Sequence, residues 1–425
     1  MQASESVISV CFNSSLLRYG GDIAVGAMTI LTSVMQFAML PLQGFTQGFA
    51  ILAAQEFGAG AYDRLRRVLA MIVKLSCWFG IAVTIISLLL VRPLLTLLHT
   101  DSAVFGGAQT YLYVQFGGSL IIIAYNMAAA VLRCLGDSRT PLFAIIAASF
   151  ANIALDLLFV MGFGWGIFGA SFATVLAQLI AFLLCLRSLR RLPFVQLTKA
   201  DWKTDPAILL HLCRLGIPTG LQMSMITLGG MVLQSVLNGF GVVFVAGYTA
   251  ANKLYGILES ASVAFGYAMT AYMGQNRGAR NAARIDAGIR AVLVLSAEFT
   301  AAIVTAMLLA GKPLLGLFLS TEEAGAADAL AVAYQYLMVL MAFLFALFML
   351  QAYRSSLQGL GEMTVPTLSG FAEMLMRMGA ALVLPTFIGR SGVFFAEGAA
   401  WVCAAALNLV WYYMRIGKIK RDMLK

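Results

Sequence analysis

Twelve continuous apolar runs, separated by short stretches of Gly, Pro and charged residues, divide the chain. All but the first are long enough for an α-helix to cross a bilayer, which takes about 20 residues. The runs lack the strict alternation of apolar and polar residues that marks a membrane β-barrel. The pattern therefore predicts an all-α polytopic membrane protein of about 12 transmembrane helices, at 3–17, 24–54, 67–91, 107–132, 140–161, 166–187, 211–237, 243–273, 288–310, 331–353, 365–388 and 392–414.

Composition supports this interpretation and excludes several classes of protein. The chain is 61% hydrophobic and 11% charged, with a mean hydropathy of +0.89, whereas soluble proteins carry roughly 25% charged residues. So few charges cannot cover a water-facing surface, which excludes a soluble enzyme, a nucleic-acid-binding domain and a disordered chain. The six cysteines show no paired spacing and only two histidines occur, so we expect no metal centre, no catalytic histidine cluster and no organic cofactor.

The basic residues predict the orientation in the membrane. Of the 28 lysines and arginines, 21 lie in the loops after even-numbered helices or in the C-terminal segment, and four lie in loops on the opposite side. Loops rich in Lys and Arg stay in the cytoplasm. We therefore expect a multi-pass protein of a bacterial cytoplasmic (inner) membrane with its C-terminus in the cytoplasm. The same asymmetry explains the net charge of +9 without a nucleic-acid partner.

The chain contains two similar halves. A shift of 220 residues places Gln55–Ala59 on Gln275–Ala279, and a shift of 225 places Leu135-Gly136-Asp137 on Leu360-Gly361-Glu362. Two six-helix halves that enter from the same side are typical of transporters built from parallel repeats. The expected organisation is an N-terminal bundle at 1–190, a polar cytoplasmic linker at 191–210 and a C-terminal bundle at 211–425.

The repeat register also predicts an incomplete first helix. Met1 aligns with Leu221, downstream of the Gly216-Ile217-Pro218 entry of the seventh helix. Residues 1–17 are therefore expected not to form a full membrane span. A truncated gene start and a genuinely short helix are both open explanations, and in a complete protein both termini would be cytoplasmic.

Charged residues inside apolar spans are candidates for function, because each is costly in lipid unless paired or hydrated. Asp156 lies four residues after Asn152, so the two share a helical face. An amide oxygen and a carboxylate suit a hard cation such as Na⁺, and the carboxylate can instead take a proton. The alternative is a protonated Asp156 that is hydrogen-bonded within the bundle.

Further intramembrane charges occur in the second half. Glu373 and Arg377 are four residues apart, and we favour a structural ion pair between them. Lys253 is expected to be paired, snorkelling or cavity-facing, and neither Lys253 nor Arg377 should face lipid. Glu259 lies too far around the helix to pair with Lys253. Glu397 is expected near a cavity or near the packing point at Gly398.

Several motifs, taken in order, resemble the MATE family of multidrug and toxin extrusion transporters. They are Gln55-Glu56-Phe57-Gly58-Ala59-Gly60, Gly136-Asp137-Ser138-Arg139-Thr140-Pro141, Asn152-Ile153-Ala154-Leu155-Asp156, the run from Trp165 to Thr174, and Gly274-Gln275-Asn276-Arg277-Gly278-Ala279. The Tyr19-Gly20-Gly21-Asp22 run is similar to a bacterial multidrug-exporter branch of that family. The resemblance extends over nearly the whole chain.

The resemblance implies a secondary active antiporter. An inward flow of Na⁺ or H⁺ would drive export of small amphipathic, often cationic organic compounds, and the expected protein is a monomer surrounded by membrane lipid. The cation-coupling site of the family would correspond to Asn152, Asp156 and Thr174. Its first-helix Asp is absent here, and Asn13 is the nearest match, which leaves the choice between Na⁺ and H⁺ open.

Two other functions remain as alternatives. A flippase for lipid-linked oligosaccharides has a related fold, but its cavity should carry several bases to hold a pyrophosphate, and only Lys253 and Arg377 could serve. An integral-membrane enzyme would need a polar catalytic cluster near one face, and the sequence contains no such cluster.

Overall fold

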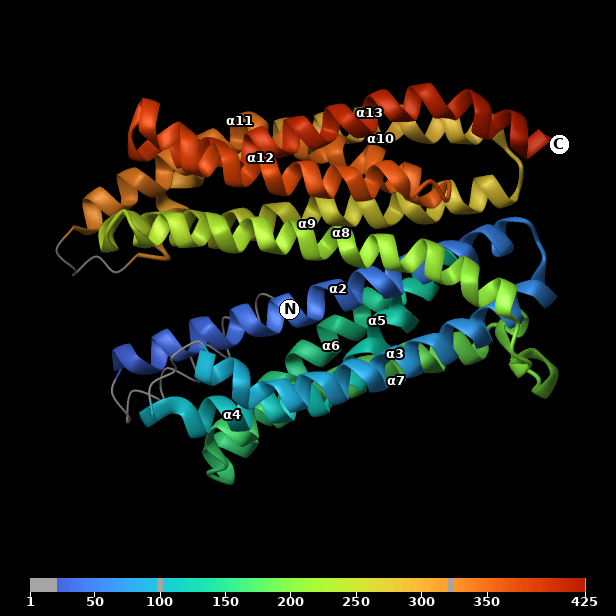
Figure 1. Cartoon of the computed structure of the whole chain (residues 1–425), viewed down its shortest axis with the longest axis horizontal. Coiled ribbons are helices and arrows are strands. Elements are labelled where there is room, and N and C mark those ends of the chain that lie inside the picture. The colour runs from blue at the N-terminus through green and yellow to red at the C-terminus, as the bar shows by residue number, and fades with distance from the viewer. Residues whose placement is uncertain (1–20, 98–101, 320–324, 425) are drawn as a thin grey trace. The chain divides into compact units, whose positions relative to one another are not determined.

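The computed structural model of the chain describes residues 21–97, 102–319 and 325–424, which form helices joined by short turns, with no strand among them (Figure 1). The helices assemble into two compact units, residues 1–220 and 221–425. The boundary falls inside one long helix, α8 (Pro206–Asn238). It therefore lies downstream of the polar segment 191–210, where the sequence predicts a linker.

In the first unit, the helices in the middle of the sequence are shorter than those before and after them. The unit contains α2 (Gly21–Gly58), α3 (Tyr62–Leu97), α4 (Ser102–Gly117), α5 (Ser119–Cys134), α6 (Arg139–Asp156), the π-helical turn η2 (Leu157–Gly162), α7 (Gly166–Arg191), the 3₁₀ turns η3 (Pro193–Val195) and η4 (Lys199–Trp202), and the start of α8. The helix expected at 3–17 lies outside the described residues, and so does Asn13.

The second unit is built from longer helices. It contains the rest of α8, followed by α9 (Val242–Gly278), α10 (Ala282–Gly316), α11 (Ala326–Gly359), α12 (Thr364–Ile388), the 3₁₀ turn η5 (Arg390–Phe394) and α13 (Phe395–Leu424). Its core lies where α9, α11 and α13 meet, and Tyr336, Phe348 and Trp401 are almost fully buried there. The Tyr248 and Tyr336 rings stack with centroids 4.4 Å apart, and their hydroxyls are hydrogen-bonded at 3.1 Å.

The eleven expected spans from 24–54 onward all overlap helices of the structure. Eight helices among the described residues are long and apolar enough to cross a membrane, and the bent pair α4–α5 would make nine. Helix α9 is not among the eight, and it carries Asn252, Lys253 and Glu259 within its length. A multi-pass membrane protein is thus supported, whereas the number of twelve crossings stays a prediction.

The span expected at 107–132 is two helices rather than one. Helices α4 and α5 meet at Gly117-Gly118 with a bend of 44°. A β-carbon at Gly118 would lie 2.5 Å from Cγ2 of Val175 on α7. Only glycine therefore allows α7 to approach this closely, and a pair of glycines is a common site of helix kinks.

Helices α2 and α8 cross through glycines within the first unit. A β-carbon on Gly48 would lie 2.6 Å from Cα of Gly216, and one on Gly44 would lie 2.8 Å from Cα of Gly220. Each helix carries its two glycines four residues apart, so they lie on one face. Small residues at this spacing let membrane helices pack backbone to backbone.

Replacing Gly48 with alanine is expected to lower thermal stability. The added methyl group would meet backbone atoms, which cannot rotate away, and overpacking of this kind costs about 1–3 kcal/mol. Gly230→Ala on α8 is the matched control, because nothing lies within 4 Å of a β-carbon there. Thermal unfolding of the purified protein in detergent measures both variants. Equal midpoints for the two would show that the α2–α8 crossing is not tightly packed.

The polar segment between the bundles folds against the first unit. Lys74 of α3 donates hydrogen bonds to the Trp202 carbonyl at 2.5 Å and to Oγ1 of Thr204 at 2.9 Å. The carboxylate of Asp201 accepts from the backbone N–H and hydroxyl of Thr198 at 2.8 and 2.7 Å. The bonds from Lys74, together with an ion pair between Arg66 of α3 and Asp201 at 3.6 Å, hold the segment against the N-terminal half of α3.

The Gly136–Pro141 motif has a structural explanation at the start of α6. The Asp137 carboxylate accepts hydrogen bonds from the Thr140 backbone N–H at 3.0 Å and the Thr140 hydroxyl at 2.6 Å. The Ser188 hydroxyl on α7 donates a third at 3.3 Å. Asp137 therefore caps α6 and ties it to α7. Desolvation acts to raise the pKa of Asp137, but these hydrogen bonds outweigh it and hold the pKa below its ordinary value.

Asp137→Ala is expected to cost about 1 kcal/mol of stability, the usual effect of losing a helix cap. Because the pKa of Asp137 is lowered in the folded protein, its contribution is present at neutral pH and is lost as the pH falls through the folded-state pKa. Thermal unfolding of both proteins at neutral and acidic pH is the measurement, and the difference should shrink in acid. A difference that does not change with pH would contradict a role for the ionised carboxylate.

Candidate functional site

Asn152 and Asp156 are buried together in the last turns of α6. Their relative exposures are 3% and 1%. All four oxygen and nitrogen atoms at the ends of these two side chains are buried and have no hydrogen-bond partner among the described residues. Buried polar groups are nearly always satisfied, so two adjacent unsatisfied side chains on one helical face are an exception that needs an explanation.

The backbone changes its helical form immediately after Asp156. Helix α6 ends at this residue, and the chain continues as the π-helical turn Leu157–Gly162. Such turns are rare and occur frequently at functional sites. The turn is held by aromatic packing, because the Phe159 ring stacks on Trp165 at 5.1 Å and contacts Phe172 of α7 at 5.8 Å. The Asp156 side chain therefore lies at the junction of α6 and the π-helical turn, and the packing of Phe159, Trp165 and Phe172 stabilises that turn.

Thr174 is half-buried on α7, which packs along α6. Its hydroxyl donates to the carbonyl of Ala170 in the preceding turn, at 3.1 Å. The hydroxyl oxygen keeps free lone pairs when it donates in this way. The structure thus brings Asn152 and Asp156 together and puts Thr174 on the neighbouring helix, while Asn13 lies outside the described residues.

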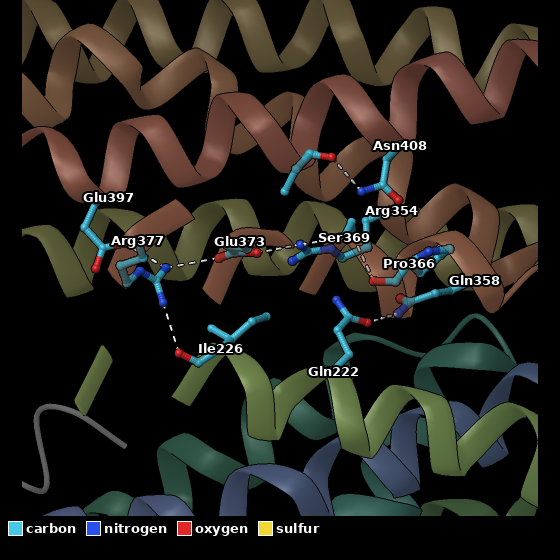
Figure 2. A network of polar contacts seen from close by, with 11 residues as sticks. Gln222, Ile226, Arg354, Gln358, Pro366, Ser369, Glu373, Arg377, Glu397 and Asn408 are labelled. Atoms are coloured by element: carbon cyan, nitrogen blue, oxygen red, sulfur yellow. Dashed lines mark hydrogen bonds and ion pairs between the residues drawn. The ribbon is translucent and has the colours of Figure 1, made fainter. Parts of the chain in front are cut away.

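The second unit contains a buried chain of alternating charges (Figure 2). Arg354 of α11 donates to Glu373 Oε2 of α12 at 2.5 Å, and Arg377 donates to Glu373 Oε1 at 3.0 Å. Arg377 also pairs with Glu397 Oε2 of α13 at 2.8 Å. The order Arg354–Glu373–Arg377–Glu397 balances two positive and two negative charges and links three helices.

A fourth helix joins the same chain through its backbone. Arg377 donates to the Ile226 carbonyl of α8 at 3.0 Å, as Figure 2 shows. A carbonyl inside a helix is already engaged with the N–H four residues later, so this second bond uses its other lone pair. Arg377 and Glu373 are only 5% and 3% exposed. The expected ion pair between them is confirmed, and so is the expectation that Arg377 does not face lipid.

Arg354 is a member of the charge chain that the sequence does not point to. The positive-inside count places it in a loop after an expected span at 331–353, whereas α11 continues to Gly359 and Arg354 is 4% exposed. The expectation is therefore wrong, because the helix extends past the apolar run. The only available signal was the partly polar stretch Gln351–Gln358, which has no Gly or Pro to end the helix.

Glu397 and Glu259 lie close to this charge chain in different ways. Glu397 is the terminal acid of the charge chain and is bound to Arg377; its place near a cavity or near the packing point at Gly398 stays a prediction. Glu259 of α9 is half-buried and is hydrogen-bonded to Tyr255. It also lies within electrostatic range of Glu397, Arg377 and Glu373. It is the one carboxylate of this group for which the described residues provide no ion pair.

Lys253 lies away from the charge chain. Its side chain is exposed on the face of α9 that also presents Thr249, Ile257 and Ser260. Lys253 and Glu259 therefore do not pair, as the helical spacing predicts. The expectation that Lys253 avoids lipid stays a prediction.

Comparison with known proteins identifies relatives over almost the whole chain. The MatE family model matches residues 1–158 and 218–383. The probable multidrug resistance protein YpnP of Bacillus subtilis is 30% identical over 99% of this chain and 92% of that protein. The multidrug export protein MepA of Staphylococcus saprophyticus is 22% identical over 96% of this chain and 90% of that protein.

Solved structures show the same fold. A MOP superfamily transporter from Pyrococcus furiosus superposes with a TM-score of 0.89 and 23% identity, over 98% of this chain and 93% of that chain. A crystal structure of MATE in complex with MaL6 gives a TM-score of 0.90 and 22% identity, over 98% of this chain and 94% of that chain.

Proposed function

The chain belongs to the MatE family of multi-pass membrane transporters, and from this premise we propose that it is a secondary active antiporter. It would export small amphipathic, often cationic organic compounds in exchange for Na⁺ or H⁺. The observation that carries the proposal is the buried, unsatisfied pair Asn152 and Asp156. Relatives named as multidrug resistance and multidrug export proteins support export as the direction of transport.

The arrangement around Asp156 suits ion coupling. An ionised carboxylate in this buried site has no hydrogen-bond donor among the described residues, so it favours either protonation or a bound cation. The amide oxygen of Asn152 and the hydroxyl oxygen of Thr174 are neutral ligands of the kind that a hard cation accepts. When the site is closed, a proton or a cation must neutralise the Asp156 carboxylate. When the site opens to water, that ion can leave. Binding and release of the ion can therefore favour different conformations of the protein.

Coupling to the exported compound follows from that bias. If the ion and the compound favour different conformations, each changes the affinity for the other by the same factor. Asp156 would carry the ion, and residues of the second unit would contribute to the compound's site. Glu259 lies near the charge chain but, unlike Glu373 and Glu397, has no ion pair among the described residues, so we assign it the contact with a cationic group.

The proposed setting is a bacterial cytoplasmic membrane, with the base-rich loops and the C-terminus in the cytoplasm. This orientation rests on the distribution of Lys and Arg, because loops rich in these residues stay in the cytoplasm. Transport needs no organic cofactor in this scheme, and a monomer suffices because the buried Asn152–Asp156 pair and the charge chain each come from residues of this one chain.

The flippase alternative is less well supported. A pyrophosphate needs several free bases, but Arg377 is engaged by Glu373, Glu397 and the Ile226 carbonyl. Lys253 remains as the one base of the expected pair that is exposed. The named relatives are multidrug proteins, and an enzyme of the membrane has no support from the comparisons.

Efflux of a fluorescent cationic dye from vesicles tests the proposal. Purified protein is reconstituted, dye is loaded, and either a Na⁺ or an H⁺ gradient is imposed. Gradient-dependent dye movement with one ion identifies the coupling ion. Dye movement that is the same with and without either gradient would reject antiport.

A further inference from the structure

A cavity of about 370 Å³ opens at one end of the second unit. It lies between the end of α9, the turn from α11 to α12, and the last turns of α13. Six charged residues line it, namely Arg277, Arg280, Glu362, Arg415, Lys418 and Asp422. Four bases against two acids give the cavity a surplus of positive charge.

The bases differ in how far they are already engaged. Arg277 donates to the Leu360 carbonyl and lies near Glu362. Arg415 stacks over the Trp411 ring at 4.9 Å, and its Nε atom is buried with no hydrogen-bond partner among the described residues. Arg280 and Lys418 are exposed and enter none of the ion pairs of the described residues. Arg280 and Lys418 are therefore available to bind an anion in the cavity.

The internal repeat shows that Arg277 and Arg280 are not required for this turn of the fold. In the 220-residue register, Arg277 and Arg280 occupy the places of Phe57 and Gly60. Gly60 has φ of 68°, and Arg280 has φ of 53°. A left-handed conformation is easy for glycine and costs about 1–3 kcal/mol for other residues. The second half thus keeps a strained arginine where the first half uses glycine.

The corresponding turn of the first half carries an aromatic residue in the place of Arg277. Phe57, in the place of Arg277, packs on Phe194 at 5.4 Å, and Tyr62 packs on Phe194 at 5.3 Å. Aromatic side chains close that turn, whereas the equivalent turn of the second half borders an open, basic cavity. The first unit has a cavity of about 380 Å³ that Arg64, Arg67 and Asp205 line, but no residue of its aromatic turn borders that cavity. The two arginines that the turn itself contributes to the lining, Arg277 and Arg280, are therefore specific to the second unit.

We propose that this cavity binds the phosphate group of an anionic membrane lipid. Arginine guanidinium groups match phosphate oxygens in geometry and charge. The cavity lies at the base-rich ends of α9 and α13, where a cytoplasmic leaflet would present its headgroups. One turn earlier, α13 exposes Val410, Tyr413 and Met414, an apolar surface along which acyl chains can lie. That surface favours a lipid over a soluble phosphate.

A bound headgroup would join three separate segments of the second unit. The segments are the α9–α10 turn, the α11–α12 turn and the end of α13. A ligand that binds the folded state and not the unfolded state stabilises the folded state. Anionic lipid should therefore raise the unfolding temperature. The inference uses membrane insertion but neither Asp156 nor the exported compound, so it can fail independently of the proposed antiport.

The test is a titration of short-chain phosphatidylglycerol into full-length protein in a neutral detergent, with phosphatidylcholine as the reference lipid. Affinity is followed by tryptophan fluorescence and by the unfolding midpoint, and Trp411→Phe identifies the signal from the cavity. Arg280→Gln with Lys418→Gln should weaken phosphatidylglycerol binding roughly 30-fold, about fivefold for each base. The matched control, Arg284→Gln with Arg421→Gln, removes the same charge from exposed positions outside the lining and should bind as the parent protein does.

The outcomes separate the sources of phosphate. Weak binding by the first double variant, with an unfolding midpoint in phosphatidylcholine equal to that of the parent, supports the site. Equal weakening in both double variants would show general surface attraction and overturn it. If inorganic phosphate alone reproduces the full effect and displaces the lipid, a soluble anion occupies the cavity and the lipid assignment is wrong.

Discussion

Asp156→Asn is expected to abolish gradient-driven dye export while leaving the protein folded. Asparagine has the shape of aspartate but carries no charge and takes up no proton at physiological pH. The buried site at the end of α6 would then be neutral in both conformations, so an ion gradient could not bias one over the other. Dye efflux from vesicles under Na⁺ and H⁺ gradients is the measurement, together with the unfolding midpoint.

The unfolding midpoint of Asp156→Asn should not fall. The parent carboxylate is buried with no hydrogen-bond partner among the described residues, so removal of its charge takes away an unfavourable desolvation. Asp63→Asn is the matched control, because it makes the same chemical change at an exposed carboxylate. Export by Asp156→Asn with an unchanged ion dependence would remove Asp156 from the coupling role.

Glu373→Gln is expected to give the largest loss of stability. Glu373 lies between Arg354 and Arg377 and bonds to both. Its neutralisation therefore leaves the buried Arg354 without an acid partner and leaves Arg377 with Glu397 alone. Breaking a buried ion pair on one side costs about 3–5 kcal/mol. Thermal unfolding in detergent should show a midpoint well below that of Glu397→Gln, which removes one contact at the more exposed end of the chain.

A compensating double variant makes this prediction sharper. Arg354→Met with Glu373→Leu removes one base and one acid, and it leaves Arg377 paired with Glu397. Replacing a buried pair by apolar residues of similar volume is often neutral, so the double variant should be more stable than Glu373→Gln. If it is less stable, packing or backbone effects rather than charge balance dominate at this position.

Local spacing along the chain was sufficient for much of the candidate site. Asn152 and Asp156 share a face because residues four apart in a helix are neighbours, and the same rule placed Glu373 beside Arg377. These relations need no knowledge of which helices pack together. The helices themselves follow from apolar runs of membrane length, because backbone groups in lipid must be bonded within the segment.

Relations between helices could not be obtained from spacing. Arg354 and Glu397 reach the charge chain from α11 and α13, and no pattern along the chain says which helix faces α12. Helix α11 also extends beyond its expected end at 353 to Gly359, because its last turns are polar and yet lie buried. Burial there depends on neighbouring helices rather than on the hydropathy of the segment itself.

The sequence by itself determined that this protein is helical, apolar enough for a membrane, internally repeated, and a carrier of an acid–amide pair at the end of one helix. Those properties depend on composition and on contacts within a few residues. Only the tertiary structure decided that the second unit's charges form one balanced chain, that the segment at 191–210 packs on α3, and that Arg277, Arg280, Arg415 and Lys418 border one cavity. Each of these depends on which distant segments come together, and packing decides that.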